Sequence, residues 1–148
     1  MTELIAIPVR QYQTSDLNDL LTVWDISNRL AHPFLTDDFI VQERLNIKNM
    51  YLPNADTWVV EINNKVVGFI ALIGNEVGGL FVDPRFHSSG LGKALMDKAS
   101  YLHDTLELDV FKANKLGRSF YCRYGFDETI ESIHEATGNS VIRLVYTS

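Results

Sequence analysis

The sequence predicts a mixed α/β fold. Short segments of alternating or continuous apolar residues that end at turn residues predict strands, whereas apolar residues spaced at i, i+3, i+4 and i+7 predict helices. The two kinds of segment interleave along 148 residues, a length typical of one domain. The chain contains no internal repeat, linker or low-complexity stretch. We therefore expect residues 1–148 to form a single domain.

The first third of the chain is expected to contain one strand and two helices. An apolar strand is predicted over residues 4–10, and Thr14 or Ser15 can cap the helix that follows. The apolar face of this helix consists of Leu17, Leu20, Leu21 and Trp24. Thr36, followed by two aspartates that favour a helix N-terminus, is expected to open a helix that continues to about Met50.

The rest of the chain is expected to alternate between strands and helices. Helices are predicted to begin at Leu91 and Asn114. Strands are predicted over residues 57–62, 66–73, 76–82, 105–110, 126–133 and 141–146. The turns Asn63-Asn64 and Gly74-Asn75 indicate hairpins. Glycine weakens a strand, so the pair Gly78-Gly79 marks either a bulge or a place where a ligand comes close.

One unbroken run of residues combines a strand end, a turn, a glycine loop and a helix start. The apolar stretch 80–82 stops at Asp83-Pro84, because proline removes a ladder donor. Gly90 and Gly92 then flank the first residue of a helical stripe. The first turn of a helix carries N–H groups without intrahelical partners, so small residues there allow a diphosphate to bind. An ordinary strand-to-helix turn would contain the same glycines.

The glycine loop matches neither common nucleotide motif. Leu95 stands where the dinucleotide fingerprint needs a small residue, and Lys93 is not followed by Ser or Thr as in a P-loop. The loop His87-Ser88-Ser89-Gly90-Leu91-Gly92 resembles instead the coenzyme A loop of the GCN5-related N-acetyltransferases (GNAT), Gln/Arg-x-x-Gly-x-Gly/Ala. His87 departs from this pattern and supplies a weaker fixed charge than arginine.

A second motif follows in the order that the GNAT pattern requires. Asn114 is followed by Phe120-Tyr121 and then by Gly125-Phe126, in a helix that Gly125 is expected to end. The chain is identified as a small single-domain member of the family, with the resemblance covering about residues 4–146. The resemblance implies the GNAT fold, in which helices flank a central, mostly antiparallel sheet.

The resemblance also implies an activity, namely transfer of an acetyl group from acetyl-coenzyme A to a primary amine by direct attack in a ternary complex. The strand at residues 80–82 would lie beside the pantetheine arm, and the backbone from Ser88 to Lys93 would meet the pyrophosphate. The implied cofactor-binding residues are Leu80, Phe81, Val82, His87, Ser88, Ser89, Gly90, Leu91, Gly92, Lys93 and Asn114.

Two residues are expected to carry the chemistry. A primary amine is mostly protonated at neutral pH and needs a base before it can attack. Glu76 begins the strand before the loop, a place from which some family members present a glutamate base. Tyr121 matches the family's tyrosine acid, which protonates the departing thiolate. Either residue could instead be structural, with Tyr121 a core-edge aromatic, or a water chain could serve as the base.

Composition excludes several other classes of protein. The formal net charge of −6 argues against nucleic-acid binding, although residues 85–123 contain seven of the thirteen Lys and Arg and could favour an anionic cofactor. The sequence has no apolar run long enough for a membrane span and no signal peptide, so we expect a cytoplasmic protein. We expect it to be a monomer or a homodimer. The four histidines lack ligand spacing, so no metal site is predicted, and Cys122 is assigned to helix packing.

The acceptor is left open by the sequence. In the family the substrate wall is usually built around the segment that corresponds here to residues 28–39, where we expect Phe34 to pack in the core and His32 to be a loop hydrogen-bonder rather than a base. The sequence is compatible with a small-molecule amine, a peptide N-terminus or a protein lysine as the acceptor. The alternatives are a non-catalytic domain that binds acyl-coenzyme A and a transferase of a longer acyl group.

Overall fold

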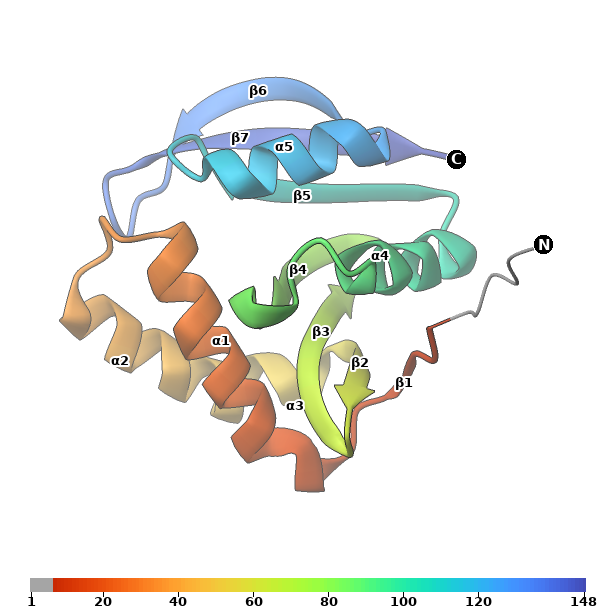
Figure 1. Cartoon of the computed structure of the whole chain (residues 1–148). Helices are drawn as coiled ribbons and strands as arrows, with labels where there is room; N and C mark the ends of the chain where they lie inside the picture. The colour runs from red at the N-terminus through yellow and green to blue at the C-terminus, as the bar shows by residue number, and fades with distance from the viewer. Residues whose placement is uncertain (1–6) are drawn as a thin grey trace.

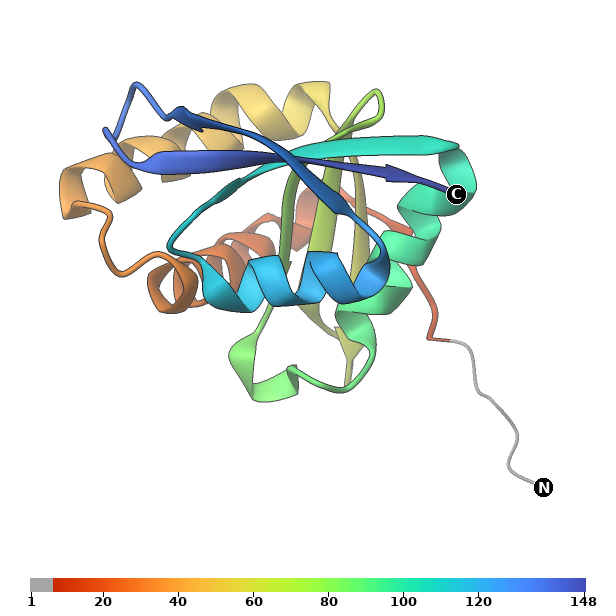
Figure 2. The ribbon, with the colours of Figure 1, turned by 90° about the horizontal axis from the view of Figure 1, so that it is seen from above.

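The computed structural model describes residues 7–148, which form a seven-stranded sheet with helices packed on both of its faces (Figures 1 and 2). The strand order is β1-β2-β3-β4-β5-β7-β6, and only β4 and β5 are parallel neighbours. The strands are β1 (Arg10–Gln11), β2 (Asp56–Ile62), β3 (Lys65–Ile73), β4 (Glu76–Val82), β5 (Thr105–Phe111), β6 (Asp127–Ile133) and β7 (Ser140–Thr147). The predicted mixed α/β fold with a mostly antiparallel sheet is confirmed.

The helices also follow the predicted order. They are η1 (Thr14–Asp16), α1 (Leu17–Ala31), α2 (Asp37–Asn46), the π-helical turn η2 (Ile47–Tyr51), α3 (Leu52–Asn54), η3 (Pro84–Phe86), α4 (Leu91–Leu102) and α5 (Lys115–Tyr124). The predicted cap of α2 is present, since the Thr36 hydroxyl accepts the N–H of Phe39 at 3.2 Å.

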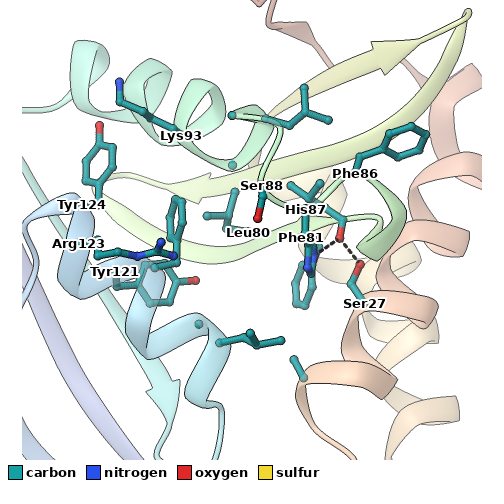
Figure 3. Close-up of a pocket in the computed structure, with 18 of the residues that line it drawn as sticks. Ser27, Leu80, Phe81, Phe86, His87, Ser88, Lys93, Tyr121, Arg123 and Tyr124 are labelled. Atoms are coloured by element: carbon teal, nitrogen blue, oxygen red, sulfur yellow. Dashed lines mark hydrogen bonds between the residues drawn. The ribbon is translucent and has the colours of Figure 1, made fainter.

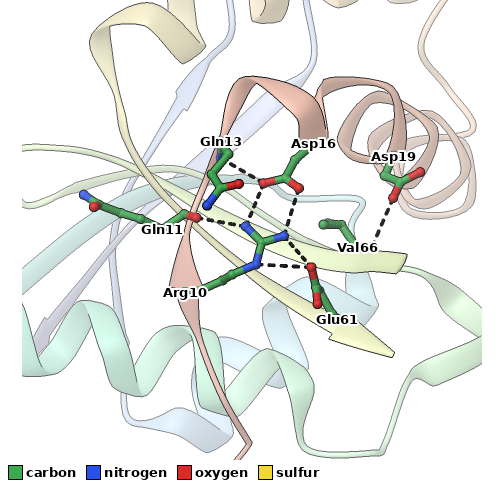
Figure 4. Close-up of polar contacts among 7 residues, drawn as sticks. All are labelled: Arg10, Gln11, Gln13, Asp16, Asp19, Glu61 and Val66. Carbon is green, nitrogen blue, oxygen red and sulfur yellow. Dashed lines mark hydrogen bonds and ion pairs between the residues drawn. The ribbon is translucent and has the colours of Figure 1, made fainter. Parts of the chain in front are cut away.

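Two element boundaries differ from the sequence prediction. The helix expected to end near Met50 continues to Asn54, because a π-helical turn joins α2 to α3. The first strand covers only Arg10 and Gln11, and residues 4–6 of the predicted strand lie outside the described residues. Arg10 pairs with Asp16 of η1 and Glu61 of β2, and these ion pairs connect β1 to both elements (Figure 4).

The core consists of one apolar cluster on each face of the sheet. One cluster joins α4 to the strands through buried residues such as Leu95, Met96 and Ile70. The other joins α1 and α2 to the opposite face through residues such as Leu20 and Phe69. The predicted amphipathic faces of α1 and α4 are therefore both buried. Within residues 7–148, no helix is both long enough and apolar enough to cross a membrane.

β4 and β5 separate soon after β4 begins. They pair in parallel at Glu76 and Glu107, and the N–H of Glu107 also donates to the Asn75 carbonyl at 3.1 Å. Beyond this point no further register pair joins the two strands within the described residues. The sheet therefore opens between the end of β4 and the strand β5, beside residues 80–82, where the resemblance implies that the pantetheine arm lies.

A bulge lies on the other side of β4. The register between β3 and β4 shifts between Ala71 and Leu72, which leaves Gly78 as an extra residue in β4. Of the two features that the sequence allowed for Gly78-Gly79, a bulge or the close approach of a ligand, the bulge is present. Side chains alternate between the two faces of a sheet along a strand. The extra residue therefore moves the side chains at the start of β4 to the face opposite the one they would otherwise occupy.

Candidate active site

A cleft of about 790 Å³ lies where the sheet opens (Figure 3). One wall is the end of β4 with the following loop and the first turns of α4, the facing wall is α5, and the last turns of α1 lie between them. The lining residues are Ser27, Leu30, Ala31, Leu80, Phe81, Val82, Phe86, His87, Ser88, Gly90, Leu91, Gly92, Lys93, Asp97, Asn114, Leu116, Gly117, Phe120, Tyr121, Arg123, Tyr124 and Tyr146.

The loop before α4 presents backbone donors to this cleft. Gly90 is the N-cap residue of α4 and has φ +86°, a left-handed conformation that glycine adopts without strain. Ser88 is also left-handed, with φ +64°. The backbone N–H groups of Ser88 to Lys93 donate to no other residue within 7–148. A helix N-terminus with free N–H groups and small side chains is suited to an anionic phosphate.

The end of β4 is fixed by two side chains that share one acceptor. The Ser27 hydroxyl of α1 donates to the Val82 carbonyl at 2.9 Å, and His87 Nε2 lies 3.0 Å from the same oxygen (Figure 3). His87 therefore lines the cleft with its ring nitrogen directed at the backbone. In this conformation the imidazole helps to hold the end of β4, and the residue remains among those that the resemblance implies for cofactor binding.

Tyr121 projects from α5 into the cleft, and Figure 3 shows its hydroxyl directed toward the loop that faces it. Its ring packs edge-on against Phe120 and Phe126, with centroids 5.6 Å apart in both pairs. Burial raises the pKa of the Tyr121 hydroxyl to about 12. The hydroxyl consequently stays protonated throughout the neutral range and can act as a donor. Leu116, in the first turn of the same helix, is 59% exposed.

The positive charge expected along residues 85–123 is largely neutralised by ion pairs. Arg85 binds Asp83, Lys112 binds Glu131 and Arg118 binds Glu128. The cations that line the cleft are Lys93 and Arg123. Lys93 is itself bound to Asp97 at 2.8 Å, and Asp97 also accepts the hydroxyl of Tyr124 at 2.7 Å. Backbone donors, more than side-chain cations, therefore make this cleft suited to an anion.

Asn114 closes the site at the first turn of α5. Its Oδ1 accepts the N–H of Gly117 at 2.9 Å, which caps the helix. Its Nδ2 lies 3.2 Å from Nε2 of His32, a residue at the end of α1. His32 Nδ1 in turn lies 2.7 Å from Oδ1 of Asn28. Burial lowers the pKa of His32 to about 4, so the ring is neutral at physiological pH.

Glu76 lies apart from these residues. Its carboxylate accepts hydrogen bonds from the Arg143 guanidinium at 2.7 and 2.5 Å, and it does not line the cleft. The extra residue in β4 places Glu76 on the face of the sheet that carries Phe81, whereas Tyr121 packs against the opposite face. The structure therefore does not bring the predicted base and the predicted acid together.

The other predicted site residues meet in the cleft, with one exception. Leu80, Phe81, Val82, His87, Ser88, Gly90, Leu91, Gly92, Lys93, Asn114 and Tyr121 all line it. Ser89 does not, and its hydroxyl bonds back to the Phe86 carbonyl. Sequence reasoning missed Ser27, Leu30 and Arg123. The first two lie on a helix far from both motifs, and no local pattern marks them, but Arg123 could have been found because it follows Tyr121 by two residues.

The residues present fit coenzyme A. The diphosphate would meet the free N–H groups of the loop, and the pantetheine arm would run beside the end of β4, on the side where β5 no longer pairs with it. Gly92 provides room at the helix start, since a Cβ atom there would lie 3.3 Å from the ring of Phe120. The aromatic lining supplied by Phe81, Phe86 and Phe120 is suited to the apolar parts of such a ligand.

Comparison with known proteins points to one family. A family model described as an acetyltransferase (GNAT) domain matches residues 53–128. Over 119 residues, the chain is 33% identical to the peptidyl-lysine N-acetyltransferase YiaC of Escherichia coli, covering 80% of this chain and 82% of YiaC. Over 126 residues, it is 29% identical to the peptidyl-lysine N-acetyltransferase YjaB of the same organism, covering 84% and 85% of the two chains.

Solved structures agree with this result. The solution structure of apo YjaB from Escherichia coli superposes with a TM-score of 0.85 at 26% identity, covering 96% of this chain and 98% of YjaB. The PaiA N-acetyltransferase of Thermoplasma acidophilum, solved in complex with coenzyme A, superposes with a TM-score of 0.73 at 20% identity, covering 94% and 98%. At that identity the second likeness shows the fold alone.

Proposed function

This chain belongs to the GCN5-related N-acetyltransferases, enzymes that use acetyl-coenzyme A as acetyl donor, and on that basis we propose that it acetylates the side-chain amine of a peptidyl lysine. One observation supports the site in particular. Ser88, Gly90, Leu91, Gly92 and Lys93, whose backbone N–H groups have no acceptor within residues 7–148, line the same cleft as Tyr121. We propose that residues 1–148 act as one cytoplasmic domain, as a monomer or homodimer.

The donor is held mainly by backbone groups in this proposal. The N–H groups at the start of α4 bind the pyrophosphate, and the positive end of the helix dipole adds to the attraction. Lys93 and Arg123 lie at the edges of the cleft, where they can add charge toward the phosphates. Leu80, Phe81 and Val82 border the pantetheine arm, and Asn114 supplies the remaining N–H of its amide.

The reaction is direct attack in a ternary complex. The neutral amine attacks the thioester carbonyl, the new C–N bond forms, and the C–S bond breaks to release coenzyme A as a thiolate. Tyr121 donates a hydrogen bond to the leaving sulfur from a hydroxyl whose pKa of about 12 keeps it protonated. A thiol, with a pKa near 8.5, is a stronger acid than this tyrosine. The hydrogen bond therefore stabilises the negative charge that develops on the sulfur, and Tyr121 does not need to become a free tyrosinate.

The proton that the amine loses needs an acceptor. Glu76 stays our proposed base, acting from the other face of the opened sheet once the ammonium or a bridging water displaces part of its pairing with Arg143. A water chain to solvent is the alternative route. Among the cleft residues, Asp97 is already engaged by Lys93 and Tyr124, so it is a poorer candidate.

A lysine acceptor is supported by relatives and by charge. The two curated relatives described above are named peptidyl-lysine N-acetyltransferases. The formal net charge of −6 favours the approach of a cationic acceptor over an anionic one. Leu30 and Leu116, which are 51% and 59% exposed, border the cleft and can contact the apolar stem of a lysine.

The test is an acceptor panel with acetyl-coenzyme A, read by mass spectrometry and by free-thiol release. The panel contains a lysine peptide with a blocked N-terminus, the same peptide with arginine in place of lysine, a peptide with a free N-terminus and no lysine, and polyamines. We expect a 42 Da adduct on the lysine peptide. Adducts confined to polyamines or N-termini would contradict a lysine acceptor, and succinyl-coenzyme A in parallel tests acyl preference.

A further inference from the structure

The last turns of α1 contact both walls of the cleft. On one side the Ser27 hydroxyl binds the Val82 carbonyl at the end of β4. On the other side His32 approaches the Asn114 amide, which caps α5. Because β4 and β5 pair only at Glu76 and Glu107, the strand ladder does not set the separation of these walls. Hydrogen bonds from α1 bridge the place where the ladder is missing.

The polarity of the His32 contact follows from the backbone. Asn114 Oδ1 must accept, since it faces the N–H of Gly117 at 2.9 Å. The amide group nearest His32 is therefore Nδ2, a donor. Nε2 of His32 must then be unprotonated, which places the ring proton on Nδ1, where Oδ1 of Asn28 accepts it at 2.7 Å.

The surroundings of His32 permit only the neutral ring. The residue is 8% exposed, and its ring lies edge-on to Phe34 and Phe111, with centroids 5.8 and 4.9 Å away. Nδ2 of Asn28 has no partner within residues 7–148, and its Oδ1 contacts Nδ1 of His32. A chain of directed hydrogen bonds thus runs from α1 through His32 to the first turn of α5.

We propose that His32 is a positioning residue for acetyl transfer: by accepting from Asn114 through Nε2, it fixes the Asn114 amide and the start of α5, and thereby the placement of Tyr121 across the cleft. Asn114 then presents its second Nδ2 hydrogen to the cleft as a donor. This inference rests on the proposed role of Tyr121. His32 itself takes no proton in the reaction, because both its nitrogens are engaged.

Two substitutions separate this role from packing. His32→Phe keeps an aromatic ring among Phe34 and Phe111 but cannot accept a hydrogen bond. His32→Gln loses the ring but retains a carbonyl oxygen near the position of Nε2. We expect kcat to fall about tenfold or more in the Phe variant and to recover to within about threefold of the parent in the Gln variant. If packing alone mattered, the Phe variant would be the more active of the two, and the proposal would be overturned.

A double-mutant cycle tests the partner. In an Asn114→Ala background, His32→Phe should change kcat by no more than about twofold, because the bond it removes is already absent. Independent, multiplicative effects would contradict the link. His134→Phe is the matched control. The ring of His134 also lies beside Phe111, with centroids 5.2 Å apart, but its imidazole bonds to Thr137 and not to Asn114. We therefore expect near-parental kinetics in this variant.

A spectroscopic measurement keeps the inference separate from the acceptor assignment. In the ¹⁵N-labelled protein, we expect His32 as the Nδ1–H tautomer at neutral pH, with an Nε2 resonance that shifts in Asn114→Ala. This result requires neither turnover nor an acceptor, so it holds even if lysine peptides are not substrates. An Nε2–H tautomer in the parent protein would overturn the proposal, because that nitrogen could not accept from Asn114.

Discussion

Gly92 in the first turn of α4 lies directly against the ring of Phe120 on α5. A Cβ atom at position 92 would stand 3.3 Å from Phe120 Cε2 and 3.5 Å from Cζ. A side chain at position 92 would therefore crowd the Phe120 ring beside the loop and require that ring to move by a few tenths of an ångström. The close packing against Phe120 is thus one physical reason for a glycine at position 92.

Gly92→Glu should abolish binding of acetyl-coenzyme A while leaving the domain folded. The new side chain would displace Phe120 and bring a negative charge to the N–H groups that are proposed to bind the pyrophosphate. Calorimetric titration measures the affinity, and circular dichroism checks the fold. Tyr101→Glu is the matched control, since it adds the same charge on the same helix at a side chain that is 83% exposed and outside the cleft. Equal affinity in the Gly92→Glu variant would remove the loop from the cofactor site.

Much of this site could be predicted because its signals are local. The strand end, the glycine loop and the helix start are contiguous in sequence, and so are the cap Asn114, the helix α5 and the glycine that ends it, Gly125. Short-range patterns of this kind depend on backbone conformation and helix periodicity, which neighbouring residues determine. The loop and α5 consequently lie where the sequence placed them.

The parts that could not be predicted depend on contacts between distant residues. Ser27 meets Val82 across 55 positions, and His32 meets Asn114 across 82. Neither pair carries a local signal. The placement of Glu76 depends on one extra residue, Gly78, which reverses the alternation of side chains along β4. The glycine pair suggested a bulge, but its effect on the face that Glu76 occupies follows only from the register with β3.

Glu76→Gln distinguishes a base from a partner of an ion pair. A general base at this position predicts a fall in kcat of roughly 10² to 10⁴, with the affinity for acetyl-coenzyme A little changed. Glutamine also weakens the hydrogen bonds to Arg143. An ion-pair role alone therefore predicts reduced stability with an unchanged pH–rate profile. The measurement is the pH dependence of kcat, with Asp109→Asn as control because Asp109 also binds Arg143.

Gly117→Ala should reduce activity even though alanine favours helices. A Cβ atom at position 117 would lie 2.5 Å from Nδ2 of Asn114, so the capping amide must leave its place. The gain in helix propensity, about 1 kcal/mol, offsets a lost cap of about the same size, and we expect little change in melting temperature. The kcat/KM for acetyl-coenzyme A should fall about tenfold. Ser119→Ala, an exposed change on the same helix, is the control, and parental kinetics in Gly117→Ala would show that the Asn114 cap is dispensable.

Asp16→Asn should change the acid stability of the protein. Arg10 binds both carboxylate oxygens of Asp16 at 2.8 and 2.9 Å, and the N–H of Gln13 binds one of them (Figure 4). The hydrogen bonds from Arg10 lower the pKa of Asp16 in the folded protein. The stabilisation is therefore fully present above the unfolded pKa of about 3.9 and is lost as pH falls through the lower folded value.

Urea unfolding at pH 7 and at steps down to pH 3 measures this effect. At pH 7 we expect Asp16→Asn to lose roughly 1–3 kcal/mol, the usual range for a hydrogen-bonded charged group. The difference between variant and parent should shrink as pH falls below about 4. A difference that stays constant down to pH 3 would show that the ion pair with Arg10 contributes nothing to the acid transition.

Tyr121 connects the cofactor cleft to the proposed chemistry. Tyr121→Phe removes only the hydroxyl and keeps the ring packing against Phe120 and Phe126. Steady-state kinetics with acetyl-coenzyme A and the preferred amine tests the claim directly, with calorimetry as a check on cofactor affinity. We predict a fall in kcat of about tenfold or more with nearly unchanged affinity and melting temperature. Full activity in the Phe variant would contradict the account and leave Tyr121 with a packing role alone.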